Sequence, residues 1–381
     1  MNRYRCSSLL SIAVIVVFLV CASSGRCDFL QVSPERTFSF PRDHGAHEEY
    51  PIEWWYFTGH LSAKNKDVEV ASRTFGFELT FFRVGINQEQ NAQATPWHVS
   101  SLYLAHAAIT DDQNQKFLFE KIRVRPDFHQ AGASQERLEV WAKDWRVEQG
   151  RDGANDTTIH LEVNAKDTTT NERFSFSLTL NPRKPPILQG KDGYSQKGER
   201  SGDASYYVSF TRLEGQGEVV MGEEPIPVTA SAWMDHEVLS SEPNSGEVGW
   251  DWFSIQLENN WECMLYDLKR GNPLARTEYS SGSCVSPDGE KIALSSSDFV
   301  IRHNRTWRSK ESGIEYPAGW EVSIPKVGLD VRITPTVPQQ ELLSKGGGER
   351  SYWEGRCLVK GRFGSEAQEG AAYVELVGYN R

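Results

Sequence analysis

The sequence predicts an all-β fold of the sandwich or barrel type. Aromatic residues make up 11% of the 381 residues and include 12 tryptophans, a composition that favours strands. Short runs of alternating apolar and polar residues follow one another from Glu48 onward. In FSFSLTL (174–180), for example, the Phe and Leu side chains share one face and the Ser and Thr side chains the other. No amphipathic helix of ordinary length interrupts these runs, so each is expected to form a strand with one apolar face.

The first 27 residues have the features of a secretory signal peptide. Arg3 and Arg5 precede an apolar stretch from Leu9 to Val20, and small residues follow it. The stretch is shorter than the roughly 20 residues that span a bilayer. We therefore expect a signal peptide over 1–27 and a secreted or periplasmic protein, with a lipid anchor at Cys21 left open.

A weak internal repeat divides the rest of the chain. WWYFTGHL (54–61) aligns with WDWFSIQL (250–257), and a second run follows each of them, FELTFFRV (77–84) and ECMLYDLK (262–269). The pattern indicates a duplicated β-unit, although aromatic strands can also resemble one another by chance.

The loops then set the domain boundaries. After an N-terminal extension over 28–47, we expect one unit over 48–240 and a second over 241–381, because SSEPNSGEVG (240–249) has the composition of a linker. A second stretch, 181–203, is too rich in Pro and Gly for a regular element and is long for a connection. Either its Lys191, Asp192, Tyr194 and Lys197 form a lid over a barrel mouth, or the stretch is a plain surface loop.

Charge and cysteine content exclude some classes of function. A net charge of -11 argues against nucleic-acid binding, which relies on basic patches. Cys263 and Cys284 are the closest cysteine pair after the signal peptide and could form a disulfide, but Cys357 leaves no clear framework. No spacing of Cys and His residues is typical of a zinc site, so no metal and no cofactor is expected.

One candidate site lies in EYPIEWWYFTGH, where Glu53 is followed by Trp54, Trp55 and Tyr56. A carboxylate beside three aromatic residues is either a pocket acid with a raised pKa or a strand-end residue facing water.

A second candidate is the triplet Asp235, His236 and Glu237 in TASAWMDHEVLS. Strand alternation places Asp235 and Glu237 on one face and His236 on the other. All three would converge at a barrel rim only if the strand ended or bulged at Asp235. The structural alternative is that Asp235 caps a turn and His236 makes a hydrogen bond in the core.

Aromatic residues beside acids mark two further places. Trp250 and Trp252 share a strand face that suits an apolar chain or a transient cation, and Tyr266 and Asp267 follow in the next run. His106 lies on a strand face with His98, and a metal site of these two with Asp235 lacks supporting ligand spacing. Nucleophile elbows, phosphate-binding loops and dinucleotide fingerprints are missing from the sequence. Acid–base chemistry in an aromatic pocket, or binding without chemistry, therefore remains.

Several motifs in order resemble one family: YPIEWWYFTGHL, GFELTFFR, LYLAHAAITD, GKDGYSQKG, SYYVSFTRL, AWMDHE, GWDWFSIQL and YVELVGY. Together they are similar to the carotenoid hydratase and AttH-like family of lipocalin-like proteins, also described as secreted hydrolases. The resemblance runs from about residue 48 to the C-terminus. It implies two lipocalin-like antiparallel β-barrels in tandem, with an isoprenoid or lipid-like ligand inside a barrel or between the two. The carotenoid-acting members hydrate a terminal isoprenoid double bond without a cofactor.

For this chemistry the resemblance implies an acid, a sheltered cation and a positioned water. The expected catalytic residues are Asp235 or Asp267 as acid, with His236 orienting it, together with Glu237 and Tyr266. The expected ligand-binding residues are Glu53, Trp54, Trp55, Tyr56, His106, Tyr194, Trp250 and Trp252.

One residue departs from the carotenoid-acting members. Val238 follows the DHE triplet, where those members carry an aromatic residue. With the expected secretion, this favours the AttH-like branch over a carotenoid substrate. Three alternatives stay open: a hydratase or hydrolase, a lipid carrier or export accessory protein with a membrane-associated transporter as partner, and a metal-dependent hydrolase.

Overall fold

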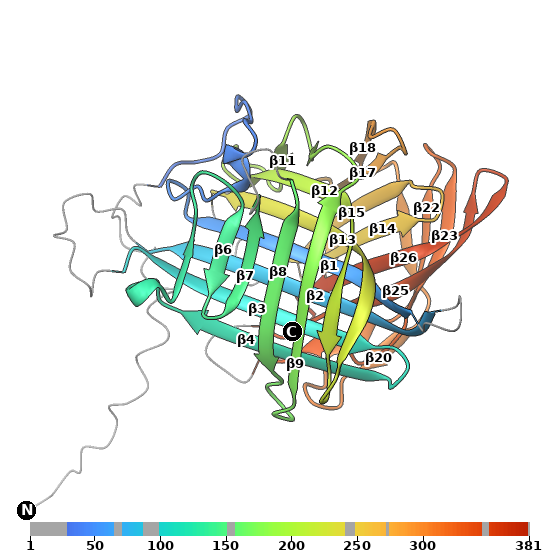
Figure 1. Cartoon of the computed structure of the whole chain (residues 1–381). Helices are drawn as coiled ribbons and strands as arrows, with labels where there is room; N and C mark the ends of the chain where they lie inside the picture. The colour runs from blue at the N-terminus through green and yellow to red at the C-terminus, as the bar shows by residue number, and fades with distance from the viewer. Residues whose placement is uncertain are drawn as a thin grey trace, which may run out of the picture.

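The computed structural model describes residues 29–64, 71–86, 99–150, 157–240, 248–271, 274–344 and 350–379, and strands dominate these residues (Figure 1). The expected signal peptide and most of the expected linker, 241–247, lie outside this range. No helix in the described part is long and apolar enough to cross a membrane. The two 3-10 helices described there, η2 (Arg42–His44) and η3 (Asp127–His129), are single turns.

The first half of the chain forms a sheet that curls into a nearly closed barrel. Among the described residues it has 13 strands in the order β4-β3-β2-β1-β13-β12-β9-β8-β7-β6-β5, with β10 and β11 also paired to β12. The strands are β1 (Ile52–Lys64), β2 (Ala71–Gly85), β3 (Ser101–Asp111), β4 (Lys116–Val124), β5 (Ala131–Ala133), β6 (Glu139–Ala142), β7 (Trp145–Gln149), β8 (Ile159–Lys166), β9 (Arg173–Pro182), β10 (Ile187–Leu188), β11 (Tyr194–Gln196), β12 (Ala204–Val220) and β13 (Pro225–Leu239). The turn that follows β8 reaches β4, where Thr168 N–H donates to the Phe119 carbonyl at 2.9 Å.

The second half forms an open half-barrel beside the first (Figure 1). Its described residues give 11 strands in the order β18-β17-β15-β14-β26-β25-β23-β22-β19, with β16 paired to β15 and β24 to β25, and a separate ribbon of β20 and β21. The strands are β14 (Val248–Leu257), β15 (Glu262–Arg270), β16 (Ala275–Arg276), β17 (Ser281–Val285), β18 (Lys291–Ser295), β19 (Val300–His303), β20 (Thr306–Arg308), β21 (Glu315–Pro317), β22 (Trp320–Ile324), β23 (Leu329–Pro335), β24 (Glu341–Leu342), β25 (Tyr352–Phe363) and β26 (Glu366–Val377).

The order of the strands confirms the predicted duplication. β1 lies between β2 and β13 in the first sheet, and β14 lies between β15 and β26 in the second. In the strand register, Tyr56 pairs with Asp235 in the first sheet and Trp252 pairs with Glu375 in the second. The aligned aromatic segments therefore occupy equivalent places in the two sheets. The fold class expected from the sequence, two tandem lipocalin-like barrels, is thereby confirmed, with the second barrel left open.

Alternating side chains build the core of each unit. In β9 the four apolar residues of FSFSLTL are buried and the polar residues between them are more exposed, as the pattern predicts. β13 behaves differently, because every residue from Ala232 to Leu239 is buried. One face of this strand packs into the first barrel, and its other face is covered by the second unit.

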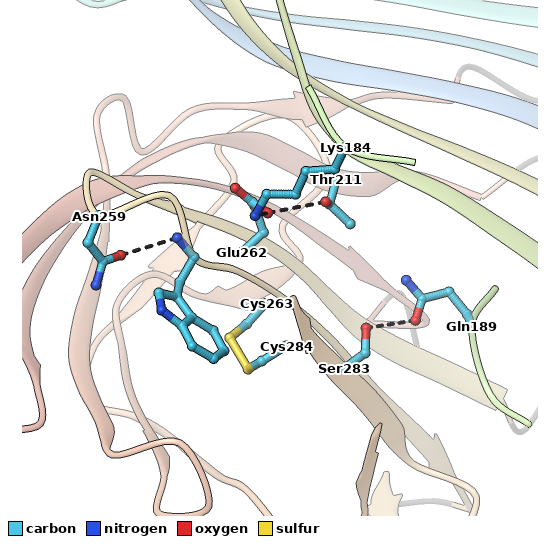
Figure 2. The surroundings of a disulfide bond; sticks show 9 residues. Lys184, Gln189, Thr211, Asn259, Glu262, Cys263, Ser283 and Cys284 are labelled. Atoms are coloured by element: carbon cyan, nitrogen blue, oxygen red, sulfur yellow. Dashed lines mark hydrogen bonds and ion pairs between the residues drawn. A yellow bond between two sulfur atoms is a disulfide. The ribbon is translucent and has the colours of Figure 1, made fainter. Parts of the chain in front are cut away.

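The stretch 181–203 straps the two units together and is no plain surface loop. Its Lys184 Nζ lies 2.5 Å from Glu262 Oε2 of the second sheet, and Ser283 Oγ donates to Gln189 Oε1 at 2.8 Å (Figure 2). A bulge in β12 adds Arg212, whose Nε donates to Glu262 Oε1 at 2.6 Å.

The disulfide lies beside this contact. Cys263 and Cys284 are bonded across β15 and β17, so the pair suggested by the sequence is confirmed (Figure 2). Cys357 is buried and free.

Candidate active site at the seam between the two units

Aromatic side chains fill the seam where the outer face of the first sheet meets the second. We call this group the aromatic seam; its buried members are Tyr56, Tyr207, Trp233, Trp252, Met264, Tyr266, Leu268 and Tyr373, with partly buried Trp54, Trp250 and Tyr279 packed against them. Tyr56 and Trp252, which come from different units, meet edge to face with ring centroids 5.1 Å apart. The seam therefore brings together the aromatic residues of both repeats.

Asp235 is the acid at the centre of the aromatic seam. Its Oδ1 accepts hydrogen bonds from Ser209 Oγ at 2.5 Å and Trp233 Nε1 at 2.7 Å, and its Oδ2 accepts one from Tyr207 at 2.5 Å. The Tyr207 hydroxyl accepts in turn from Trp252 Nε1 at 3.0 Å. Burial raises the pKa of Asp235 to about 7, despite donors that favour the ionised form. Asp235 is thus a carboxyl that can carry its proton near neutral pH.

Glu237 faces the same side two residues further along β13. Ser205 Oγ donates to its Oε1, and Lys197 Nζ lies 2.6 Å from the same oxygen. Lys197 comes from the strap 181–203, and its Nζ lies 4.2 Å from the centroid of the Tyr266 ring and 5.3 Å from that of Tyr207. A cation and a carboxylate therefore sit between aromatic rings beside Asp235.

Glu375 is the counterpart of Asp235 in the second unit. It holds the equivalent place in the register, and Trp250 Nε1 donates to its Oε2 at 2.8 Å, much as Trp233 donates to Asp235. Burial raises the pKa of Glu375 to about 7 as well. The two repeats thus contribute one raised-pKa acid each, and each acid is held by an indole N–H.

Two more carboxyls extend the acid cluster along the seam. Tyr56 donates to Glu354 Oε1 at 2.5 Å, and Thr80 donates to Glu78 Oε1 at 2.6 Å. Burial raises the pKa of Glu78 to about 7 and, helped by the nearby Glu78, raises that of Glu354 well above its usual range.

The opposite face of the same strands carries a separate polar network. His236 Nε2 and His47 Nδ1 each lie 2.8 Å from Glu53 Oε1, and Arg83 Nε lies 3.2 Å from Glu53 Oε2. His236 stacks on Trp55 at 5.1 Å, and the Trp55 indole donates to the His44 carbonyl at 3.0 Å. We call this group the clasp, because it fastens the N-terminal extension to the first barrel.

The clasp corrects two expectations from the sequence. Glu53 is neither a pocket acid with a raised pKa nor exposed to water: burial would raise its pKa, but hydrogen bonds from His236 and His47 hold it well below its usual value. His236 does not orient Asp235, because β13 continues through the triplet without a bulge and the two side chains take opposite faces.

The clasp is also where a metal ion could be sought. In the described part of the chain, His47, Glu53 and His236 are the one group of His and acidic side chains with ligand atoms close enough for a metal. Arg83 pairs with Glu53, and Arg36 pairs with Asp43, which lies next to His47. A divalent cation here would add buried positive charge without compensation, so the residues fit a hydrogen-bonded clasp better than a metal site.

The remaining candidates lie apart from Asp235. Asp267 takes the other face of β15 from Tyr266, with Arg276 Nε 3.0 Å from its Oδ1, and burial raises its pKa. Tyr194 packs against a separate buried cluster that includes Val32 and Tyr50. His106 shares the seam face of the sheet, where its Nδ1 lies 2.8 Å from Tyr352 Oη, and burial lowers its pKa well below the usual value. His98 lies outside the described residues.

The structure thus gathers Asp235, Glu237, Tyr266, Trp54, Tyr56, Trp250 and Trp252 in the aromatic seam and separates them from Glu53, Trp55, His236, Asp267 and Tyr194. Sequence reasoning named Lys197 only as part of a lid over a barrel mouth, and it missed Tyr207 and Glu375. Glu375 could have been found by extending the repeat to the closing motif YVELVGY, which contains it.

These features define a class: a two-unit, lipocalin-like β protein with an acid-lined aromatic seam. The AttH-like family pattern matches residues 31–379, and the chain belongs to this family. Kievitone hydratase of Fusarium solani subsp. phaseoli is 22% identical over 271 residues, which cover 66% of this chain and 75% of that protein.

Solved structures agree on the fold. An AttH structure from Nitrosomonas europaea has a TM-score of 0.77 at 29% identity and covers 92% of this chain and 100% of that one. Kievitone hydratase from Nectria haematococca has a TM-score of 0.61 at 14% identity, with 92% and 98% covered. At that identity the second likeness supports the fold alone.

Proposed function

We propose that this protein adds water to a carbon–carbon double bond of an apolar, isoprenoid or lipid-like ligand at the aromatic seam. The observation that carries the proposal is Asp235, a buried carboxyl whose pKa is raised to about 7 among aromatic rings. An acid of this kind keeps its proton in a substantial fraction of the molecules at neutral pH, and it stands beside aromatic faces that attract a cation. The kinship with a protein named kievitone hydratase supports the same reaction class.

The reaction needs no cofactor in this proposal. Asp235 passes its proton to the Tyr207 hydroxyl 2.5 Å away, and Tyr207 passes its own proton to the double bond. The π electrons of the double bond form the new C–H bond. The cation left on the more substituted carbon is stabilised by the rings of Tyr56, Trp252 and Tyr266. Water adds to this carbon, and the proton it releases returns to the ionised Asp235 through Tyr207. The sum is alkene plus water giving a tertiary alcohol.

A test uses kievitone and simple prenyl compounds as trial substrates in water enriched with oxygen-18. We expect a product heavier by one labelled water, detected by mass spectrometry. Asp235→Asn should lower the rate by at least about 100-fold, the lower range for loss of a general acid. Asp111→Asn is the control, because Asp111 is buried in an ion pair with Arg73 away from the seam. Full activity of Asp235→Asn would refute the assignment of the acid.

A carrier without chemistry is the second candidate. It is favoured by the three donors on Asp235, which would also suit a fixed structural group. In that case the wild type binds the trial ligands and forms no product, and Asp235→Asn binds them equally well.

A further inference from the structure

We infer that Lys197 anchors an uncharged oxygen atom of the ligand, so that the ligand class is an apolar molecule with a carbonyl or phenolic group near its double bond. The inference rests on the proposed function in one respect, namely that the aromatic seam is where the ligand binds. It adds a polar recognition element to a site otherwise described by rings and acids.

The burial of Lys197 is the first support. Its side chain is 6% exposed, yet Nζ has no hydrogen-bond partner among the described residues. The contact of 2.6 Å with Glu237 pairs the charges without the alignment of a hydrogen bond. An ammonium group has three N–H donors, and leaving them unmade in a buried place is costly. A ligand oxygen would accept a hydrogen bond from one of these donors.

The backbone holds this lysine in place. Lys197 N–H donates to the Asp203 carbonyl at 2.7 Å, and Arg270 Nη2 donates to the Lys197 carbonyl at 3.1 Å. The second contact comes from β15 of the other unit, so both units fix the position of the residue. A donor held this firmly is suited to orient a ligand.

The charges around Lys197 determine which kind of ligand oxygen can bind there. Glu237 already compensates the charge of Lys197, because its Oε1 lies 2.6 Å from the Lys197 Nζ. A carboxylate or phosphate on the ligand would therefore meet like charge, whereas a carbonyl or phenol oxygen would not. This argues against a fatty acid or phospholipid head group.

The spacing of β13 sets the distance between the two ends of the ligand. Asp235 and Glu237 lie on one face two residues apart, which is roughly 7 Å along a strand. The oxygen at Lys197 and the double bond near Asp235 should therefore be separated by about one aromatic ring.

The test compares two probes, 4-(3-methylbut-2-enyl)phenol and (3-methylbut-2-enyl)benzene, which differ in the hydroxyl alone. Affinities are measured by quenching of tryptophan fluorescence. We expect the wild type to bind the phenol at least about tenfold more tightly, as for a hydrogen bond to a charged group. Lys197→Met should bring the ratio close to one. The double variant Lys197→Met with Glu237→Gln leaves no unpaired buried charge and should behave in the same way, which covers a folding defect of the single variant.

Lys269→Met is the matched control. Lys269 pairs with Asp251 at 2.5 Å and lies 5.4 Å from the Tyr379 ring centroid, outside the seam, so it should keep the wild-type ratio. The inference is overturned if the wild type binds neither probe, binds both equally, or keeps its ratio in the double variant. A wild type that selects the phenol through Lys197 but adds no water to it refutes the hydration alone.

Discussion

Replacing Asp235 by Asn should change how stability depends on pH. Burial raises the pKa of Asp235 to about 7, against about 4 in the unfolded chain. The folded protein therefore keeps a proton that the unfolded chain releases, and stability falls as pH rises between these two values. From pH 5 to pH 8 this one carboxyl should remove about 3 kcal/mol from the free energy of unfolding, at about 1.4 kcal/mol per pH unit up to the folded pKa.

The assay is urea unfolding followed by tryptophan fluorescence at several pH values from 5 to 8. The amide of Asp235→Asn cannot ionise, so the variant should gain about 3 kcal/mol relative to the wild type over this range. Glu78 and Glu375 titrate in both proteins, so their contributions to the pH dependence of stability largely cancel in the difference between variant and wild type. Asp111→Asn is the control, because hydrogen bonds from Arg73 and Asn114 outweigh burial and lower the pKa of Asp111, so its difference should be flat. A flat difference for Asp235→Asn as well would refute the reasoning.

Three further variants test the strap, the disulfide and the clasp. Glu262→Gln leaves Lys184 and Arg212 buried without their anion and should cost about 3–5 kcal/mol in urea unfolding; a loss below about 1 kcal/mol would contradict this. Cys263→Ser with Cys284→Ser opens a loop with a sequence separation of 21 and should cost about 3 kcal/mol, seen as a lower Tm; an unchanged Tm would argue against it. His236→Gln should cost about 1–3 kcal/mol in urea unfolding yet leave probe affinity unchanged, since the side chain faces away from the seam; lost affinity in folded protein would count against that placement.

The fold could be predicted because its signals are local. Alternation along each run depends only on the pleat of a strand, and the repeat of Trp54 and Trp250 marks equivalent strands in the two units. The same rule correctly separated Asp235 and Glu237 from His236, whose Nε2 meets Glu53 on the inner face.

The site was harder to predict because it forms only where the two units pack against each other. Burial of both faces of β13 requires the second unit, and the run AWMDHEVL does not reveal which surface covers it. The pKa of Glu53 depends, beside burial, on His236 and His47, which both come from outside its own strand. Lys197 arrives from a strap that shows no periodic pattern.

The comparison of the two units shows which part of this arrangement belongs to the seam. By the register, Glu375 stands where Asp235 stands, so the acid on the seam face is kept in both units. The inner-face position next to it, His236 in the first unit, is Leu376 in the second, where it packs in the apolar core. The second unit, which stays open, therefore has an apolar residue where the first barrel has a clasp residue, whereas a raised-pKa acid held by an indole N–H occurs on both sides of the seam. This repetition supports the proposed role of the acids at the seam and assigns the clasp to the first barrel alone.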